Sequence, residues 1–149
     1  LKLTPLGVSY YYTYNMNSNN LRLIDANLNR LREGIRVVED IFRYIYNDKD
    51  TAIKLKTLRH LARLENYTEL LETRDVANDV LRSSIKSEQN RDNLYSILIA
   101  NFKRAQESSR VLEEFTKLTS IEDSENFKYI RYELYTLETV LTKITSNSK

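Results

Sequence analysis

Cysteine is absent from this sequence, and His60 is its single histidine. Without cysteine the chain forms no disulfide framework, no thiolate zinc site and no cysteine nucleophile. One histidine also argues against a metal site built from imidazole ligands. Both features fit a protein of the reducing cytoplasm.

Turn-forming residues are scarce as well. The chain has one proline, Pro5, and two glycines, Gly7 and Gly34. From about residue 20 onward it therefore lacks the glycine and proline signals that usually separate structural elements. This composition is typical of an all-helical protein.

Charge of one sign and long apolar runs are also missing. The 23 basic and 21 acidic side chains are mixed along the chain, so no basic stripe is available for nucleic acid. No apolar run reaches the length of about 18 residues that a membrane helix needs, and the N-terminal stretch lacks a secretory signal pattern. We expect one soluble, cytoplasmic domain that binds neither nucleic acid nor membrane.

The N-terminal stretch differs from the rest of the chain. Residues 1–19 show no helical period, begin with leucine and contain four tyrosines. We interpret them as an irregular N-terminal arm, and residues 20–149 as a single helical domain. Two explanations of the arm stay open. Either Met16 is the natural start, or the arm is ordered and packs on a partner.

Apolar spacing predicts the first helix. From about Leu21 to Tyr46, apolar side chains recur at helical intervals and fall on one face, which should lie in the core. The stripe consists of Ile24, Leu28, Leu31, Ile35, Val38 and Phe42. Asparagine and aspartate side chains at 47–50 favour a break and a restart, so a second helix is expected at about 51–71.

The segment TRDVANDV, residues 73–80, predicts a loop because its short polar side chains compete with helical backbone bonding. A third helix is expected at about 87–118. Ser120 and Asp123 resemble a capping box that begins a fourth helix, and the tail after Thr145 should fray. The fold class predicted is an all-α bundle of two helical hairpins, at about 20–72 and 88–146.

The two halves share a sequence repeat. When the chain is aligned with itself so that Ala26 matches Ala100, seven of the fifteen positions in 26–40 are identical to those in 100–114. The shared residues are mainly polar, whereas packing alone would conserve the core positions. The identical pairs are Ala26/Ala100, Asn27/Asn101, Arg30/Arg104, Glu33/Glu107, Arg36/Arg110, Val37/Val111 and Glu39/Glu113. A second alignment, shifted by two positions, matches Lys56 with Lys128 and Arg59 with Arg131.

Two explanations account for the repeated charges. The first is a surface ladder of i,i+3 ion pairs, which stabilises helices by only a few tenths of a kcal/mol. The second is an anion site in a cleft where the first and third helices meet, because arginine binds phosphate or carboxylate in bidentate geometry. Gly34 and its repeat mate Ser108 favour a tight helix crossing over backbone approach by a ligand.

Four motifs in order resemble one known family. The strings RLIDANLNRLREGIRVVED, TRDVANDV, IANFKRAQESSRVLEEFTK and FKYIRYELYTLE closely resemble the all-helical hydroxymethylpyrimidine phosphate kinase family of thiamine biosynthesis. That family occurs alone or fused in front of thiamine phosphate synthase. The resemblance covers roughly residues 21–140. It implies an ATP-dependent phosphotransferase that converts 4-amino-5-hydroxymethyl-2-methylpyrimidine phosphate to the diphosphate. One departure is VAND at 76–79, where family members often carry glycine and proline.

The resemblance, together with the chemistry of phosphoryl transfer, gives roles to the repeated residues and to three residues of the 73–80 segment. ATP, Mg²⁺ and the pyrimidine phosphate are the expected ligands. The candidates for binding phosphate or substrate are Asn27, Arg30, Arg36, Arg74, Asn101, Arg104 and Arg110. The candidate catalytic residues are Glu33, Glu107, Asp75 and Asp79, of which Glu33 and Glu107 are also candidate Mg²⁺ ligands.

A non-catalytic helical module that binds a ligand or a thiamine phosphate synthase partner is the alternative to the enzyme, and a purely structural bundle is a third hypothesis. The tyrosine-rich arm and the long helices favour a homodimer. His60 is expected at the surface or packed in place, and not as a base. Tyr129, Tyr132 and Tyr135 are expected in the helical core.

Overall fold

The computed structural model describes residues 17–147, and the fold in this range is all-helical, as predicted. The elements are α2 (Ser18–Asp40), the π-helical turn η1 (Ile41–Ile45), α3 (Lys49–Leu61), α4 (Tyr67–Glu72), the 3-10 turn η2 (Lys86–Gln89), α5 (Leu94–Thr116), α6 (Ile121–Glu138) and α7 (Leu141–Asn147). Most of the predicted N-terminal arm, and the end of the tail, lie outside the described residues.

The first long helix begins at Ser18, slightly before the predicted Leu21. The side chain of Asn17 accepts a hydrogen bond from the Asn20 amide at 2.9 Å and caps α2. All six residues of the predicted apolar stripe are buried, from Ile24 to Phe42. The helical path continues through η1, so the predicted end near Tyr46 is confirmed.

The turn after η1 depends on Asn47, whose φ of 52° lies in the left-handed region that asparagine tolerates. This conformation lets the Asp48 amide donate back to the Phe42 carbonyl at 2.9 Å. The Asp48 side chain then accepts from the Thr51 amide at 3.1 Å and caps α3. The predicted break at 47–50 is therefore a tight link between two helices.

The prediction of one helix at 51–71 is wrong, because α3 ends at Leu61 and α4 begins only at Tyr67. A contact from a distant part of the chain accompanies this break. Asn126 on α6 donates its side-chain amide to the Leu61 carbonyl at 2.9 Å, which satisfies an oxygen that a continuing helix would use. Local sequence does not show this partner.

The third helix begins at Leu94 and not near residue 87, because Asn93 and Ser96 cap each other's backbone amides at 2.9 and 3.1 Å. The predicted start of the fourth helix is confirmed, since the Ser120 hydroxyl accepts from the Asp123 amide at 3.1 Å. This helix ends at Glu138 and is followed by the separate short helix α7.

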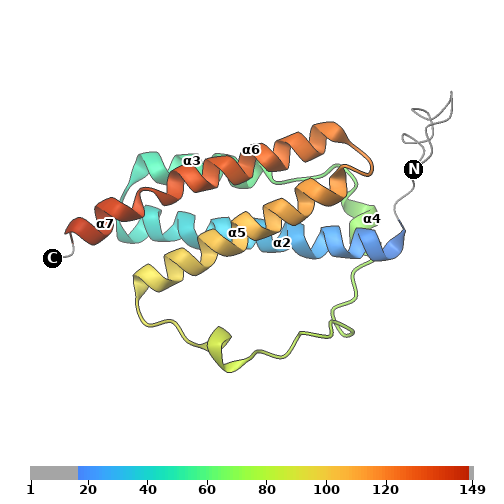
Figure 1. Ribbon diagram of the computed structural model, residues 1–149, viewed down its shortest axis with the longest axis horizontal. Coiled ribbons are helices and arrows are strands. Elements are labelled where there is room, and N and C mark those ends of the chain that lie inside the picture. The colour runs from blue at the N-terminus through green and yellow to red at the C-terminus, as the bar shows by residue number, and fades with distance from the viewer. Residues whose placement is uncertain (1–16, 148–149) are drawn as a thin grey trace.

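The four main helices form two layers, with α2 and α5 in one and α3 and α6 in the other (Figure 1). The repeat-related helices α2 and α5 make the most extensive contact in the fold, as the pseudo-symmetric arrangement predicts. At their crossing, a Cβ added to Gly34 would lie 3.1 Å from the Asn101 carbonyl oxygen and 3.4 Å from the Ala105 Cβ. Gly34 is therefore explained by a tight helix crossing.

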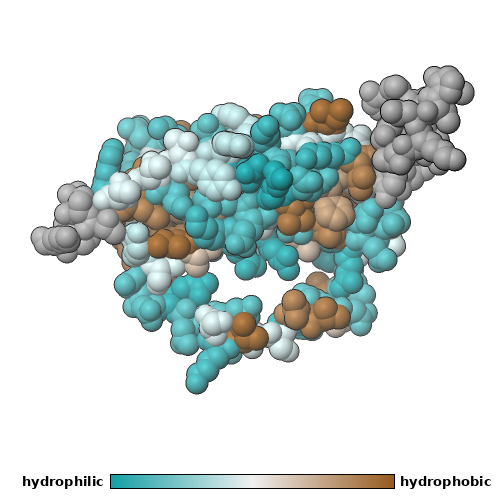
Figure 2. Space-filling view, viewed as in Figure 1, coloured by the Kyte–Doolittle hydropathy of each residue, from teal (hydrophilic) through white to brown (hydrophobic). Residues whose placement is uncertain are grey.

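Residues 73–93, here called the connecting segment, join the two halves and contain η2. Most of this segment extends away from the bundle, and open space separates it from the helices in Figures 1 and 2. Its apolar side chains are exposed, namely Val76, Val80, Leu81 and Ile85. The prediction of a loop at 73–80 is confirmed.

One prediction about the core is wrong. Tyr129, Tyr132 and Tyr135 lie on the outer side of α6 and are 53%, 54% and 42% exposed. The core positions of this helix are instead Phe127, Ile130 and Leu134, each offset by one residue or more from a tyrosine. Across residues 17–147, none of the helices combines the length and apolar character needed to cross a bilayer.

Candidate functional site

A pocket of about 480 Å³ lies between α2 and the start of the connecting segment. Its volume is within the range of small-molecule sites in proteins. The polar side chains that line it include Arg22, Arg30, Arg74, Asp75 and Asp79. Four of these were predicted as site residues from the sequence, which makes this pocket the candidate site.

Arg74 fixes the connecting segment to α2. Its Nε and Nη2 atoms donate to the two carboxylate oxygens of Asp25, both at 2.8 Å. The Asp25 side chain is only 8% exposed, and its hydrogen bonds raise the pKa of Arg74 above the ordinary value. Two of the three nitrogens of the Arg74 guanidinium are thus used in a structural pair, and the predicted phosphate contact of this residue stays a prediction.

A second contact supports the same wall of the pocket. Nη2 of Arg22 donates to the backbone carbonyl of Asp75 at 3.0 Å. The Asp75 carboxylate accepts from the Asn78 side chain at 2.7 Å and from its amide at 3.3 Å, which is the main reason that the pKa of Asp75 is lowered. Asp79 accepts from the Leu81 amide at 3.0 Å, so both acids also shape the turn.

Arg30 differs from the other cations of the pocket. Its side chain is exposed, and within residues 17–147 it makes no hydrogen bond or ion pair. Arg22 uses one nitrogen on a neutral carbonyl, so its charge is not compensated by that bond. The α2 wall therefore carries two cations available to a ligand, whereas the wall made by the connecting segment carries Asp75 and Asp79.

Other predicted residues are used by the helices themselves. Asn27 and Asn101 each donate to the carbonyl four residues earlier, at 2.9 Å, on Leu23 and Ile97. Arg36 forms a surface pair with Asp40 at 3.1 Å. Arg110 pairs with Glu113 and Glu114 on its own helix. For Arg36 and Arg110 the structure supports the charge-ladder explanation of the repeat.

Glu33, Arg104 and Glu107 lie on α2 and α5 with exposed side chains, and none of them lines the pocket. Within the described residues they take part in no hydrogen bond or ion pair through their side chains. Nor do the His, Asp and Glu side chains of residues 17–147 gather in a group of three or more that could hold a metal ion. The Mg²⁺ role predicted for Glu33 and Glu107 therefore finds no support in the arrangement of these residues.

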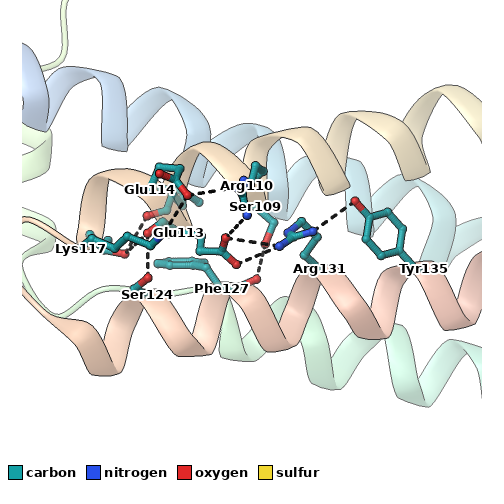
Figure 3. A network of polar contacts seen from close by, with 11 residues as sticks. Ser109, Arg110, Glu113, Glu114, Lys117, Ser124, Phe127, Arg131 and Tyr135 are labelled. Atoms are coloured by element: carbon teal, nitrogen blue, oxygen red, sulfur yellow. Dashed lines mark hydrogen bonds and ion pairs between the residues drawn. The ribbon is translucent and has the colours of Figure 1, made fainter.

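The recurring residues Glu39, Arg59, Glu113 and Arg131 form two buried ion pairs. Glu39 accepts from Arg59 at 2.8 and 3.2 Å, and Glu113 accepts from Arg131 at 3.1 and 3.3 Å. Figure 3 shows Glu113 of α5 between Arg110 and Arg131, with Tyr135 beyond Arg131. Each ion pair connects the two helices of one hairpin, α2 with α3 and α5 with α6. These four repeated residues therefore have a structural role.

Asp25 and Arg22 were missed as site residues by sequence reasoning. Neither belongs to the repeat, since the alignment that matches Ala26 with Ala100 places Ile99 and Ser96 at the equivalent positions. Their position in the sequence is the feature that could have pointed to them, because both lie within about one helical turn before the repeated motif that begins at Ala26. Only the path of the connecting segment shows that they face Arg74 and Asp75.

Comparison with curated proteins finds relatives that share one name. The chain is 38% identical over 135 residues to a thiamine-phosphate synthase of Prochlorococcus marinus, and 41% identical over 122 residues to one of Thermosynechococcus vestitus. It is 38% identical over 120 residues to one of Rhodopirellula baltica. These alignments cover 90%, 81% and 77% of this chain but 39%, 35% and 32% of the relatives. The chain thus spans about a third of the relatives' length. No solved structure matches it.

The relatives contradict one expectation. Hydroxymethylpyrimidine phosphate kinase activity was expected from the resemblance, but the curated relatives are named as a synthase and not as a kinase. The assignment as a phosphotransferase of the kinase class is therefore wrong. The comparisons connect the chain with the pathway of thiamine biosynthesis. The expected binding of ATP and Mg²⁺ stays a prediction.

A family model matches residues 22–140, which include all but the first turn of α2, the connecting segment, and the whole of α5 and α6. The match therefore contains both halves of the repeat and every polar residue of the candidate site named above. This chain belongs to the ThiD2 family.

Proposed function

We propose that this chain is a helical ligand-binding domain of thiamine biosynthesis that holds a phosphorylated small molecule in the pocket between α2 and the connecting segment. One observation carries the proposal. The α2 wall of this pocket carries Arg22 and Arg30, neither of which forms an ion pair within the described residues, and carboxylates line the wall that the connecting segment forms.

The α2 wall suits a phosphate group. Arg30 is unpaired among the described residues, and Arg22 has donors left after its single bond to the Asp75 carbonyl. A guanidinium offers paired N–H groups that match two phosphate oxygens, and charge-assisted hydrogen bonds are stronger than neutral ones. A phosphate placed here would receive hydrogen bonds from two side chains of one rigid helix.

The opposite wall favours a donor or a cation at the other end of the ligand. Asp75 keeps a lowered pKa and is therefore ionised at neutral pH, and each carboxylate oxygen has more than one acceptor position. The pyrimidine phosphate named above carries an amino group and a phosphate at separate positions. Such a molecule matches a pocket that is cationic on one wall and anionic on the other.

The relatives' name supports the same pathway. They are called thiamine-phosphate synthase, and this chain corresponds to about a third of their length. We therefore propose that the domain holds its ligand for such a synthase, on the same chain or on a separate one. Neither the pocket nor this arrangement needs a phosphoryl transfer on the domain itself.

Calorimetric titration of the chain with 4-amino-5-hydroxymethyl-2-methylpyrimidine phosphate tests the proposal, with the unphosphorylated alcohol as the matched ligand. We expect binding that depends on the phosphate. Arg30→Ala should weaken it about tenfold, because it removes a charge-assisted contact of about 1.5 kcal/mol.

Arg104→Ala is the matched control, because Arg104 is the repeat mate of Arg30, is also exposed, and lies outside the pocket. Its affinity should equal that of the unchanged chain. Equal binding of the two ligands would refute the phosphate site. Equal loss in both arginine variants would instead support a cleft shared by α2 and α5, with circular dichroism confirming that each variant is folded.

A further inference from the structure

A second, smaller pocket of about 290 Å³ lies beside the C-terminal end of α2, between η1 and α3. Three cations line it, Arg43 on η1 and Lys49 and Lys56 on α3. Lys49 and Lys56 are separated by about two helical turns, which places them on one face of the helix. Ala52 and Ile53 between them provide an apolar wall.

The basic side chains of this pocket are not paired with acidic side chains in the part of the chain that the structure describes. Among residues 17–147, Arg43, Lys49 and Lys56 form no ion pair, and Arg43 packs instead over the Tyr44 ring at 4.9 Å. Glu39 is the single carboxylate in the lining, and both of its oxygens accept from Arg59. Its charge is compensated within the protein, so the three cations leave the pocket strongly positive.

The other half of the repeat lacks this cluster. Lys117 is the mate of Arg43 when Ala26 is aligned with Ala100, and it is neutralised by Glu114 at 2.7 Å. Ile121 is the mate of Lys49 when Lys56 is aligned with Lys128, and two acidic residues follow it. Since the two halves share their helices and their buried ion pairs, the fold alone does not require three unpaired cations here.

We propose that this second pocket binds a multivalent anion through a phosphate group. Arg43, Lys49 and Lys56 would share its charge, and the volume has room for a phosphate group, for two joined phosphates, or for a phosphate with a small organic substituent. Both a free inorganic phosphate and the phosphate group of an organic ester could bind in this way. Ala52 and Ile53 would contact the organic part of an ester. This site is separate from the pocket near Arg30 and does not depend on the proposed function.

Nuclear magnetic resonance titration of the ¹⁵N-labelled chain tests the site, with inorganic pyrophosphate as one probe and phenyl phosphate as the other. We expect the amides of Asn47, Lys49 and Ile53 to shift together along one saturation curve. Whichever probe saturates at lower concentration identifies the source of the phosphate group. Lys56→Met should weaken this binding about fivefold or more, equivalent to about 1 kcal/mol.

Lys128→Met is the control, because Lys128 is the repeat mate of Lys56 and is exposed on α6. It should leave the affinity of the second pocket unchanged. Equal weakening by both lysine variants would overturn the proposal, as would shifts spread evenly over all exposed basic residues. Binding in the first pocket is reported separately, by the amides of residues 22–30 and 74–80 that line it.

Discussion

Glu39 accepts two hydrogen bonds from Arg59, at 2.8 and 3.2 Å, although only 2% of its side chain and 13% of the arginine side chain are exposed. The pair joins α2 to α3, and its repeat mate, Glu113 with Arg131, joins α5 to α6. A buried ion pair requires good geometry to offset desolvation, and both pairs use two hydrogen bonds to one carboxylate.

Glu39→Gln should lower the free energy of unfolding by about 3 kcal/mol, because it leaves the Arg59 guanidinium largely buried without a countercharge. Urea unfolding followed by circular dichroism measures the change. The control is Arg36→Ala, which removes an exposed pair with Asp40 and should cost at most about 0.5 kcal/mol. Equal effects of the two substitutions would show that the buried ion pair contributes no more to the free energy of unfolding than the exposed pair does.

The same relationship explains where sequence reasoning succeeded and where it failed. The helices and the core face of α2 follow from periodicity, which is a local property of the chain. The recurrence of glutamate and arginine was equally visible, but the partner of Glu39 lies on another helix, beyond the turn at 47–50. A pattern of identities does not distinguish a residue that faces a ligand from one that faces a buried partner.

The candidate site was predictable in part for a similar reason. Arg30 was identified from the repeat and the acids of the connecting segment from the family resemblance, and they do line one pocket. Arg104 and Glu107 were included by symmetry, but the connecting segment covers only one half of the pseudo-symmetric pair. The segment therefore breaks the symmetry on which the prediction was based.

Asp25→Asn should loosen the connecting segment, because it removes the charge that holds two nitrogens of Arg74. We expect the amides of residues 75–80 to exchange about tenfold faster with solvent, and ligand binding in the pocket to weaken. Hydrogen exchange measures the first effect and calorimetry the second. Asp40→Asn, which affects an exposed pair on the same helix, should change neither. Unchanged exchange at 75–80 would show that Arg22 alone holds the segment.

Gly34→Val should lower the free energy of unfolding by about 1–3 kcal/mol, because its side chain would meet the Asn101 carbonyl and Ala105 on α5. Thermal and urea unfolding measure the loss. Ala26→Val introduces the same side chain at an exposed position of α2 and should cost only its helix propensity, about 0.5 kcal/mol. A Gly34→Val variant as stable as this control would mean that the two helices can separate at little cost.

Asp123 should make the stability depend on pH in the direction opposite to most acids. Burial raises its pKa above 3.8, with Glu122 and Glu65 adding to the effect and the Ser120 hydroxyl opposing it. The folded chain therefore keeps this proton to a higher pH than the unfolded chain does. It follows that stability is lost as the pH rises from the ordinary pKa of aspartate through the raised value.

Asp123→Asn removes this titration, so the stability of the variant relative to the unchanged chain should increase between pH 3 and pH 7. Urea unfolding at several pH values measures the difference. A difference that decreased with pH would mean that the folded chain stabilises the Asp123 carboxylate at the start of α6, and a constant difference would mean that folding does not shift its pKa; either result would contradict the prediction.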